Sequence, residues 1–355
     1  MNHLVIMAGG VGSRFWPMST PDKPKQFIDV LGTGRTLLQL TADRFRGICP
    51  MENVWVVTSV RYRELVRRQL PEIPDSNILL EPVMRNTAPC VAYVSWKIKK
   101  RDPEANLVIS AADHIVTDVE EFRRVIRKGL AFTADADRIL TLGMFPRRPE
   151  TGYGYIKVKE GAPAADEIRE VEGFKEKPDL ATAKQYVADG SYYWNAGIFL
   201  WNVRTIEAAF RANQPEMAAL FDSLDADFYT PGEQAAIDRR FPDCRNISID
   251  YAVMEHARNI YVFPADFGWS DLGTWGSLHE QLPHDDAGNA VVGGQVCLID
   301  SRDCVVHLSG DKKVVIQGLE DYIIAEQDNV ILICRKSDEQ HIKEFSAALA
   351  EKAGR

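Results

Sequence analysis

A glycine-rich segment near the N-terminus contains the residues best suited to chemistry. The string AGGVGSRFWP directly follows a short apolar run and contains Gly9, Gly10, Gly12 and Ser13. Its glycines allow the backbone to approach a ligand closely, so that backbone N–H groups can face phosphate oxygens. Arg14 adds a planar guanidinium whose donors suit a phosphate group. The segment therefore predicts a phosphate-binding loop.

The two common explanations of a glycine-rich loop fail for this chain. A dinucleotide-binding fingerprint needs a third glycine where Phe15 stands, which argues against a nicotinamide-dependent oxidoreductase. A Walker loop needs a Gly-Lys pair, and the sequence contains none. A tight strand-to-helix turn would explain the glycines alone. It would not explain Lys25, which follows two prolines that limit the freedom of the chain. A solvated surface lysine is the alternative for this residue.

Two aspartates are candidates for binding a metal ion. Asp113 ends the apolar run 107–112, and Asp271 lies in a glycine-bounded turn. Two carboxylates, completed by phosphate oxygens and water, would suit Mg²⁺. Each aspartate could instead cap a helix or a turn. Mg²⁺ disfavours imidazole, so we expect His114 to have a structural or orienting role.

Several strings resemble the sugar-1-phosphate nucleotidyltransferase family, and they occur in the expected order along nearly the whole chain. The loop, together with Trp16-Pro17 and Pro24-Lys25-Gln26-Phe27, is similar to the mannose-1-phosphate guanylyltransferases in particular. The resemblance continues through RNTAP (85–89), Asp113-His114, TGYGYI (151–156), KEKP (175–178), WNAG (194–197) and WSD (269–271). Longer family members carry a C-terminal isomerase domain that is not seen here, so we expect the short, monofunctional type.

The resemblance implies that the chain transfers GMP from GTP to mannose 1-phosphate and releases GDP-mannose and pyrophosphate. The sugar phosphate would attack the α-phosphorus in line, with bound Mg²⁺. Arg14 and Lys25 are the candidate catalytic residues, because they can stabilise charge around the triphosphate. Asp113 and Asp271 would bind the metal. The nucleotide would contact the loop residues named above and Glu81, Arg85, Asn86 and Thr87.

For the sugar phosphate, the resemblance implies Gly154, Glu176, Lys177 and Asn195. Glu176 can accept hydrogen bonds from paired hydroxyls, Asn195 can donate and accept, and Lys177 can face the phosphate. Thr87 could also cap a helix. Asp250 could border the site or be structural, and the sequence favours neither role.

Two alternatives keep the same fold and change the function. The chain could act on another hexose 1-phosphate, because a difference of one hydroxyl is not readable from the sequence. It could also be a catalytically silent regulatory subunit that binds nucleotide sugars. The second alternative predicts damage at the catalytic and metal-binding positions, which are intact.

The elements that must position these residues follow an α/β pattern. Short apolar runs at 4–8, 54–59, 78–80, 107–111 and 139–142 predict strands, and 37–45, 64–70, 88–100 and 121–132 have helical spacing. This alternation predicts a Rossmann-like, mainly parallel mixed sheet with helices on both faces. Between 152 and 267 the pattern loosens into longer insertions, with strands expected at 153–158, 198–201 and 260–263.

The composition changes after the turn at 283–286, so we expect a catalytic domain at 1–284 and a small domain at 285–355. Strands expected at 291–299, 304–308, 314–317, 322–326 and 330–334 recur at nearly regular spacing, which favours a β-helix-like solenoid. A C-terminal helix should follow, capped by Ser337 or Asp338. We expect its apolar stripe to consist of Ile342, Phe345 and Leu349.

The bulk properties limit the partners. A net charge of -9 argues against a general nucleic-acid binder, and no apolar run is long enough to span a membrane. The N-terminus lacks a signal-peptide pattern, so we expect a cytoplasmic protein. The six cysteines form no Cys-x-x-Cys pair, and we expect them to be reduced and mostly buried. A homodimer is expected from the resemblance.

Overall fold

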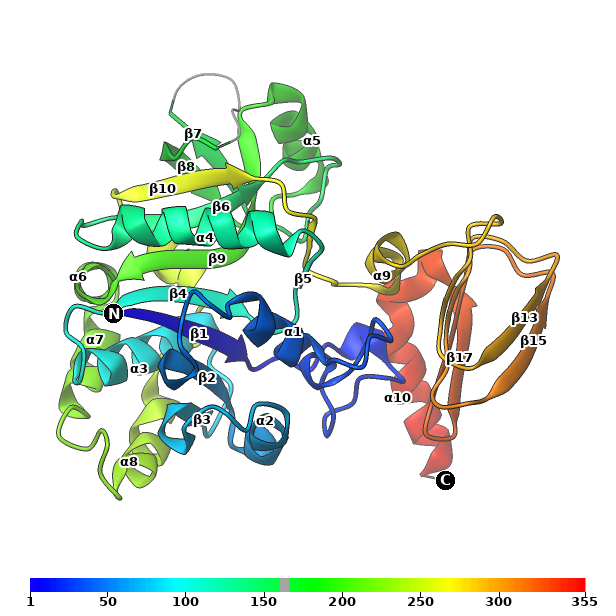
Figure 1. The fold of residues 1–355 in the computed structure, drawn as a ribbon, viewed down its shortest axis with the longest axis horizontal. Coiled ribbons are helices and arrows are strands. Elements are labelled where there is room, and N and C mark those ends of the chain that lie inside the picture. The colour runs from blue at the N-terminus through cyan, green and yellow to red at the C-terminus, as the bar shows by residue number, and fades with distance from the viewer. Residues whose placement is uncertain (160–165, 355) are drawn as a thin grey trace. The chain divides into compact units, whose positions relative to one another are not determined.

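A computed structural model describes residues 1–159 and 166–354 of the chain (Figure 1). The chain divides into two compact units. The first unit comprises Met1–Gly9, Thr41–Ala112 and Val116–Trp269. The second unit comprises Gly10–Leu40, Asp113–Ile115 and Ser270–Arg355. The predicted functional residues are therefore distributed over both units, and the second unit contains the loop after Gly9 together with both predicted metal ligands.

The first unit is built on a mixed sheet with the strand order β3-β2-β1-β4-β9-β6-β10-β8-β7. The strands are β1 (Asn2–Ala8), β2 (Val54–Ser59), β3 (Ile78–Glu81), β4 (Asn106–Ala111), β6 (Ile139–Met144), β7 (Tyr155–Val158), β8 (Arg169–Lys175), β9 (Tyr192–Asn202) and β10 (Ile260–Ala265). The predicted α/β fold is confirmed. Parallel pairing joins β3-β2-β1-β4 and β6–β10, whereas β9 runs antiparallel to β4, β6 and β7. The sheet is therefore less parallel than the sequence predicts.

Strand β9 is much longer than the expected strand at 198–201, because it pairs with different neighbours along its length. Its last residues pair with β4, and Tyr192–Trp194 pair with β7. The pairing with β6 is interrupted opposite Leu142, where Gly197 adopts a positive φ of 65°. This irregularity breaks the alternating pattern by which the sequence would identify a continuous strand.

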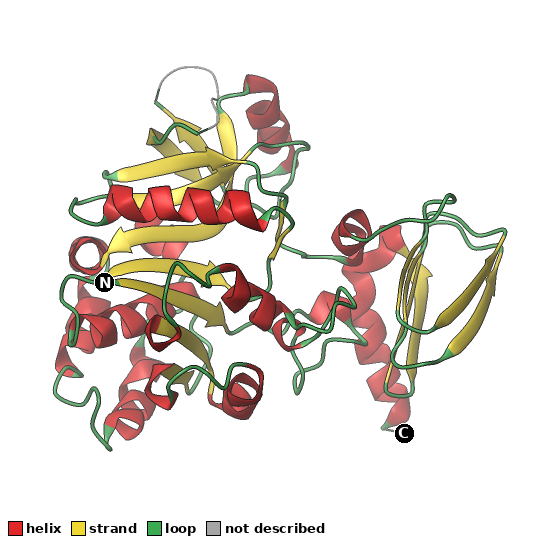
Figure 2. Cartoon of the chain, in the orientation of Figure 1, coloured by secondary structure: helices red, strands yellow, loops and turns green. Residues whose placement is uncertain are grey.

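Helices cover both faces of the sheet, as expected and as Figure 2 shows. Alternate side chains of β9 point to opposite faces. Phe199 and Trp201 belong to the core beneath α3 (Thr87–Lys99), α6 (Val203–Asn213) and α7 (Pro215–Ser223). Leu200 faces α4 (Val119–Thr133), where a Cβ on Gly129 would lie 3.0 Å from it. The remaining α-helices among the described residues are α1 (Leu37–Arg44), α2 (Arg63–Gln69), α5 (Leu180–Asp189), α8 (Glu233–Arg240), α9 (Trp275–Gln281) and α10 (Ile342–Ala353).

The second unit contains the C-terminal β domain. Strands β12 (Ala290–Val292), β14 (Val305–His307) and β16 (Tyr322–Gln327) stack in parallel, and so do β13 (Gln295–Ile299) and β15 (Lys313–Gln317). One face of the larger sheet packs on the core that contains Trp275 and Ile342, and its other face contributes Val306 and Ile324 to the core facing β13 and β15. The solenoid prediction is confirmed. Strand β17 (Val330–Arg335) ends the stack by pairing antiparallel with β16.

Two predictions about this domain are corrected. The expected strand at 291–299 is two strands, because Gly293 and Gly294 have φ values of 71° and 65° and turn the chain between β12 and β13. The expected caps Ser337 and Asp338 lie instead in a 3₁₀ turn, Lys336–His341, that precedes α10. In α10 only Ile342 of the expected stripe is buried, whereas Phe345 is 38% and Leu349 is 46% exposed.

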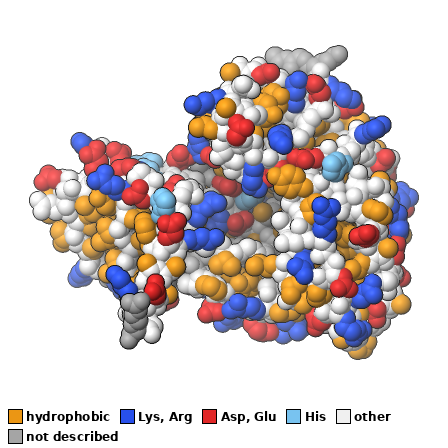
Figure 3. Space-filling view, turned by 180° about the vertical axis from the view of Figure 1, so that it is seen from behind, with side chains coloured by type: hydrophobic (Ala, Val, Ile, Leu, Met, Phe, Trp, Pro, Cys, Tyr) orange, Lys and Arg blue, Asp and Glu red, His pale blue; other side chains and the backbone are white. Residues whose placement is uncertain are grey.

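Two short strands, β5 (Ile115–Val116) and β11 (Trp269–Ser270), complete the described elements. Cys49, Cys90, Cys244 and Cys304 are buried, Cys334 is half-buried, Cys297 is exposed, and all six are free thiols, as expected. None of the helices in residues 1–159 and 166–354 combines the length and apolar character needed to cross a membrane. On the face drawn in Figure 3, basic and acidic side chains are interspersed.

The packing of α4 predicts a large stability loss at Phe122. This side chain is fully buried and makes edge-to-face contacts with Phe45 and Phe267, with ring centroids 5.2 Å apart in both pairs. Phe122→Ala should lower the free energy of unfolding by about 3–5 kcal/mol, because it leaves a cavity in a close-packed core.

Differential scanning calorimetry would measure this loss. Glu120→Gln is the matched control, since its side chain is 80% exposed on the same helix and its pair with Arg123 should contribute little. A loss below about 1 kcal/mol for Phe122→Ala would contradict the packing described here.

Candidate active site

The glycine-rich loop follows β1 and needs glycine at position 12 for two reasons. Gly12 has a positive φ of 71°, which side-chain-bearing residues rarely adopt. A Cβ at this position would also lie 2.6 Å from Cβ of Lys25. At Gly10 a Cβ would meet nothing within 4 Å, so that part of the loop is open. Ser13 begins a short 3₁₀ turn, Ser13–Phe15.

The segment after the loop fixes the loop's shape by hydrogen bonds to its carbonyls. Ser19 Oγ donates to the carbonyl of Val11, and the backbone N–H of Lys25 donates to the same carbonyl at 3.2 Å. The side-chain amide of Gln26 donates to the carbonyl of Gly10 at 2.8 Å. The local sequence pattern assigns no function to Ser19 or Gln26. Their structural role is to hold the loop.

Lys25 is buried, which rules out the solvated surface lysine. Its ammonium donates to the carbonyls of Leu272 at 2.8 Å and Asp271 at 3.2 Å, and it pairs with Asp113 Oδ2 at 2.9 Å. Burial pushes the pKa of Asp113 upward, but the charges of Lys25 and His114 outweigh that effect and hold this pKa below its usual range. Lys25 therefore joins the loop segment to both predicted metal ligands.

Arg14 and Asp271 meet at the turn around Gly273. The Nη1 of Arg14 donates to the carbonyl of Gly273 at 3.1 Å, and Asp271 Oδ1 accepts from the backbone N–H of Gly273 at 3.0 Å. Leu272, between them, has a positive φ of 48°. A bulky residue in this region of the Ramachandran map is uncommon and often marks a functional turn.

The donors of the second unit fit a hard divalent cation. Within residues 1–159 and 166–354, no group of three or more His, Cys, Asp or Glu side chains is arranged to hold a metal ion. Asp113, whose carboxylate pairs with Lys25, and Asp271, whose backbone carbonyl accepts from the same ammonium, would therefore act as a partial ligand set. Mg²⁺ suits such a set, because it retains waters and takes substrate phosphate oxygens as ligands.

The predicted base-binding residues begin at the last residue of β3 in the first unit, and they do not converge on one point. Glu81 is buried, and its Oε1 has no hydrogen-bond partner among the described residues. Burial raises the pKa of Glu81 to about 8. A Cβ on Gly9 would lie 3.9 Å from Glu81 Oε2. Arg85 instead directs two N–H groups to the carbonyl of Pro242, at 2.7 and 3.2 Å.

The cap of α3 is Asn86, not Thr87. The side chain of Asn86, which has a positive φ of 66°, accepts from the backbone N–H of Thr87 at 2.9 Å. The hydroxyl of Thr87 accepts from the backbone N–H of Ile249 at 2.8 Å. Thr87 thereby ties the start of α3 to the segment that leads into Asp250.

The four predicted sugar-phosphate residues do come together, in the first unit. A Cβ on Gly154 would lie 2.5 Å from Glu176 Oε2 and 3.3 Å from Cβ of Asn195. Lys177 Nζ lies 2.6 Å from Glu176 Oε1, and Lys177 has a positive φ of 46°. The amide of Asn195 donates to Asp250 Oδ1 at 3.0 Å. Two carboxylates, one ammonium and one amide thus form a polar cluster suited to a hydroxylated, anionic ligand.

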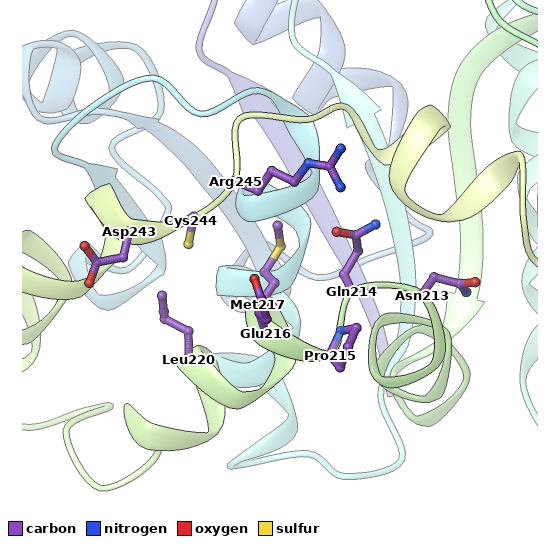
Figure 4. Close-up of a pocket in the computed structure, with 9 residues that line it drawn as sticks. All are labelled: Asn213, Gln214, Pro215, Glu216, Met217, Leu220, Asp243, Cys244 and Arg245. Atoms are coloured by element: carbon purple, nitrogen blue, oxygen red, sulfur yellow. The ribbon is translucent and has the colours of Figure 1, made fainter.

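A separate pocket of about 420 Å³ lies beside α7 in the first unit, and Figure 4 shows the side chains that line it. Gln214 and Pro215 come from the start of α7, and Arg245 comes from the segment that follows the Phe241–Asp243 turn. The nine lining residues include none of the predicted site residues.

Comparisons with known proteins agree with the resemblance. A family model described as Nucleotidyl transferase matches residues 3–287, and one described as MannoseP isomerase/GMP-like beta-helix domain matches residues 294–349. The mannose-1-phosphate guanylyltransferases of Escherichia coli strain K12 and Salmonella typhimurium strain LT2 are 35% and 36% identical over 351 residues, which is 96% of this chain and 71% of each relative.

A solved structure supports the same assignment over the whole fold. The crystal structure of a protein from Thermus thermophilus, described as a mannose-1-phosphate geranyltransferase, is 31% identical with a TM-score of 0.88 and covers 98% of this chain and 99% of that chain. With these matches, the chain belongs to the nucleotidyl transferase family and, within it, to the mannose-1-phosphate guanylyltransferases.

Proposed function

We propose that this protein transfers GMP from GTP to mannose 1-phosphate and releases GDP-mannose and pyrophosphate. The observation that carries the proposal is the 35–36% identity with mannose-1-phosphate guanylyltransferases over 96% of the chain. A phosphate oxygen of the sugar phosphate attacks the α-phosphorus of GTP. The bond from the α-phosphorus to the oxygen bridging to the β-phosphorus breaks in line, and pyrophosphate leaves with the electron pair.

The protein's part in this reaction is to align two anions and to stabilise charge. The backbone N–H groups of Gly9, Gly10, Gly12 and Ser13 bind the triphosphate. Arg14 and Lys25 are the catalytic cations. The contacts of Lys25 support a second contribution, because its ammonium also holds Asp113 and the carbonyl of Asp271 in place.

Asp113 and Asp271 are the residues that would hold Mg²⁺. The ion would supply positive charge to phosphate oxygens, which favours both the attack and the departure of pyrophosphate. Lys25 keeps Asp113 ionised, since it holds the pKa of that carboxyl below its usual range. An ionised carboxylate is the form that binds a metal ion.

Guanine recognition is assigned to Glu81, Arg85, Asn86 and Thr87. Glu81 has the chemistry for it, because an ionised carboxylate can accept from the two adjacent donors of guanine, the ring N–H and the exocyclic amine. Arg85 and Thr87 contribute by shaping this region, as their bonds to Pro242 and Ile249 indicate.

Gly154, Glu176, Lys177 and Asn195 bind the sugar phosphate. Glu176 accepts from hydroxyls, Lys177 faces the phosphate, and the missing side chain at Gly154 leaves room beside Glu176. In the proposed organisation, residues 1–284 form the catalytic domain and 285–355 a β-helix-like domain with its C-terminal helix. The protein is proposed to act in the cytoplasm as a homodimer.

The reaction itself can be tested by following pyrophosphate release. With Mg²⁺ and mannose 1-phosphate, we expect release with GTP and little with ATP, UTP, CTP or dTTP, because guanine presents a distinct set of donors. EDTA should abolish the signal. Equal rates with glucose 1-phosphate would redirect the proposal to another hexose 1-phosphate, and no release with any triphosphate would overturn it.

Removing the ammonium of Lys25 should reduce turnover strongly. Lys25→Ala is expected to lower kcat by roughly 10²–10³, because it removes transition-state charge stabilisation and leaves Asp113 without its cation. Lys23→Ala, at an exposed position two residues earlier, is the control and should leave kcat unchanged. Turnover of Lys25→Ala within fivefold of the parent would show that the ammonium is not catalytic.

The role of Glu81 can be tested through pH. Because burial raises the pKa of Glu81 to about 8, the carboxyl is mostly protonated at pH 6.5 and mostly ionised at pH 8.5. The ionised form accepts two hydrogen bonds from guanine, so the preference for GTP over inosine triphosphate, which lacks the exocyclic amine, should rise across this range by roughly tenfold.

The preference is measured as the ratio of kcat/KM values, and comparing two triphosphates cancels the titration of their phosphates. In Glu81→Gln the ratio should be low and independent of pH, because an amide offers only one acceptor group. A pH-independent ratio in the parent protein would remove Glu81 from guanine recognition.

A further inference from the structure

Asp250 is a carboxylate that the proposed reaction has not yet used. It begins a single π-helical turn, Asp250–Met254, whose N-cap residue is Ile249. The sequence left open whether Asp250 borders the site or has a structural role. In the structure, its Oδ1 accepts from the side-chain amide of Asn195 at 3.0 Å.

The orientation of the Asn195 amide is fixed by its surroundings. Its Oδ1 accepts from the backbone N–H of Gly197 at 3.2 Å and lies 2.8 Å from the hydroxyl of Thr141, which is fully buried. A backbone N–H can only donate, so the atom facing Gly197 must be the amide oxygen. The amide nitrogen then points to Asp250. The Asn195 side-chain oxygen is thus fully used by hydrogen bonds within the protein. The group that is still available to a ligand is the second N–H of its amide.

Asp250 and Glu176 carry like charges within one polar cluster. Burial, and after it the neighbouring Glu176 carboxylate, raise the pKa of Asp250 to about 7, while Lys177 and Asn195 act in the opposite direction. Lys177 is paired with Glu176. The ionised form of Asp250 is disfavoured because it is a second carboxylate beside Glu176. Ionisable groups with pKa values shifted in this way concentrate at functional sites.

The remaining hydrogen-bonding capacity of the cluster matches the hydroxyls of a sugar. Asn195 and Asp250 are only partly buried, whereas Thr141, Gly154 and Glu176 are buried. A carboxylate has several lone-pair positions, so the bond from Asn195 leaves Asp250 able to accept from another donor. A hexose hydroxyl supplies both a donor and an acceptor. One hydroxyl can therefore donate a hydrogen bond to Asp250 while its oxygen accepts a hydrogen bond from the second N–H of Asn195.

We propose that Asp250 is a sugar-binding residue that accepts a hydrogen bond from a hydroxyl of the hexose and, through its bond to Asn195, directs the remaining amide N–H toward the same sugar. The proposal rests on the proposed function, since it deepens the assignment of the same sugar-phosphate cluster. Asp250, Asn195 and Thr141 then form one chain of hydrogen bonds. Thr141 is a positioning residue that is buried beneath the site.

The test compares Asp250→Asn with the parent protein. Asp250→Asn should raise KM for mannose 1-phosphate roughly 10- to 100-fold, the range expected for losing one hydrogen bond to a charged group, and should leave KM for GTP within twofold. Asp243→Asn, an exposed carboxylate-to-amide change in the neighbouring segment, is the matched control and should leave both values unchanged. A KM for mannose 1-phosphate that stays within twofold in Asp250→Asn would overturn the proposal.

Monodeoxy derivatives of mannose 1-phosphate separate sugar contact from a structural effect. The hydroxyl that Asp250 binds is the one whose removal weakens binding to the parent protein and no longer weakens binding to Asp250→Asn. If each deoxy derivative loses the same factor in both proteins, Asp250 does not contact the sugar. Thr141→Val, which keeps the shape and removes the hydroxyl, should raise KM for mannose 1-phosphate by about threefold to tenfold through Asn195.

Calorimetric titration of mannose 1-phosphate alone tests Asp250 independently of turnover. If the parent protein releases no pyrophosphate from GTP, the proposed function fails. Weaker binding of mannose 1-phosphate by Asp250→Asn would still support the sugar-binding role. Equal binding by the two proteins, at equal melting temperatures, would overturn it. If Asp250→Asn does not fold, Thr141→Val replaces it in the titration. Unchanged binding by Thr141→Val would likewise overturn the proposed chain of hydrogen bonds.

Discussion

The buried ammonium of Lys25 is the interaction on which the second unit's functional residues depend. It contacts one carboxylate and two backbone carbonyls that come from segments far apart in the sequence. Gly12 must be glycine because the Lys25 side chain fills the space where a Cβ would stand. One ammonium therefore connects the loop, the carboxylate after β4 and the turn at 271–273. A buried cation of this kind is stable only when several acceptors surround it, so each segment constrains the others.

The sequence predicted the types of residue at the site better than it predicted their contacts. Glycines, a lysine that follows two prolines and two aspartates can be read locally, because their chemistry follows from residue type and spacing. The hydrogen bonds of Arg85 to Pro242 and of Thr87 to Ile249 span more than 150 residues, so no local pattern could reveal them. The committed orientation of Asn195 depends on a bulge and on a buried threonine from another strand, and it was equally invisible.

The same division applies to the fold. Strands β1 to β4 and β6 are apolar, and each has at least one parallel neighbour. Their hydrophobic runs predicted them well. Strand β9 was underestimated because one half pairs with β4 and the other with β7, so its burial pattern does not follow a single period. Strand β8 has exposed alternate positions and few apolar residues, and helices α5 to α8 lie in the region that the sequence presented only as insertions. Tertiary pairing decided these elements, not local propensity.

The antiparallel strand β17 has an evolutionary consequence for the C-terminal domain. Coils of a parallel solenoid are interchangeable units, so such domains can lengthen by duplication of a coil. Here β17 pairs with β16 in the opposite direction and occupies the edge on which another coil would stack. A duplicated coil would have to be inserted between existing ones, ahead of β17, and it would have to preserve the glycine corners at 293 and 294. The domain therefore cannot lengthen by simply adding a coil after the last one, because β17 occupies that edge.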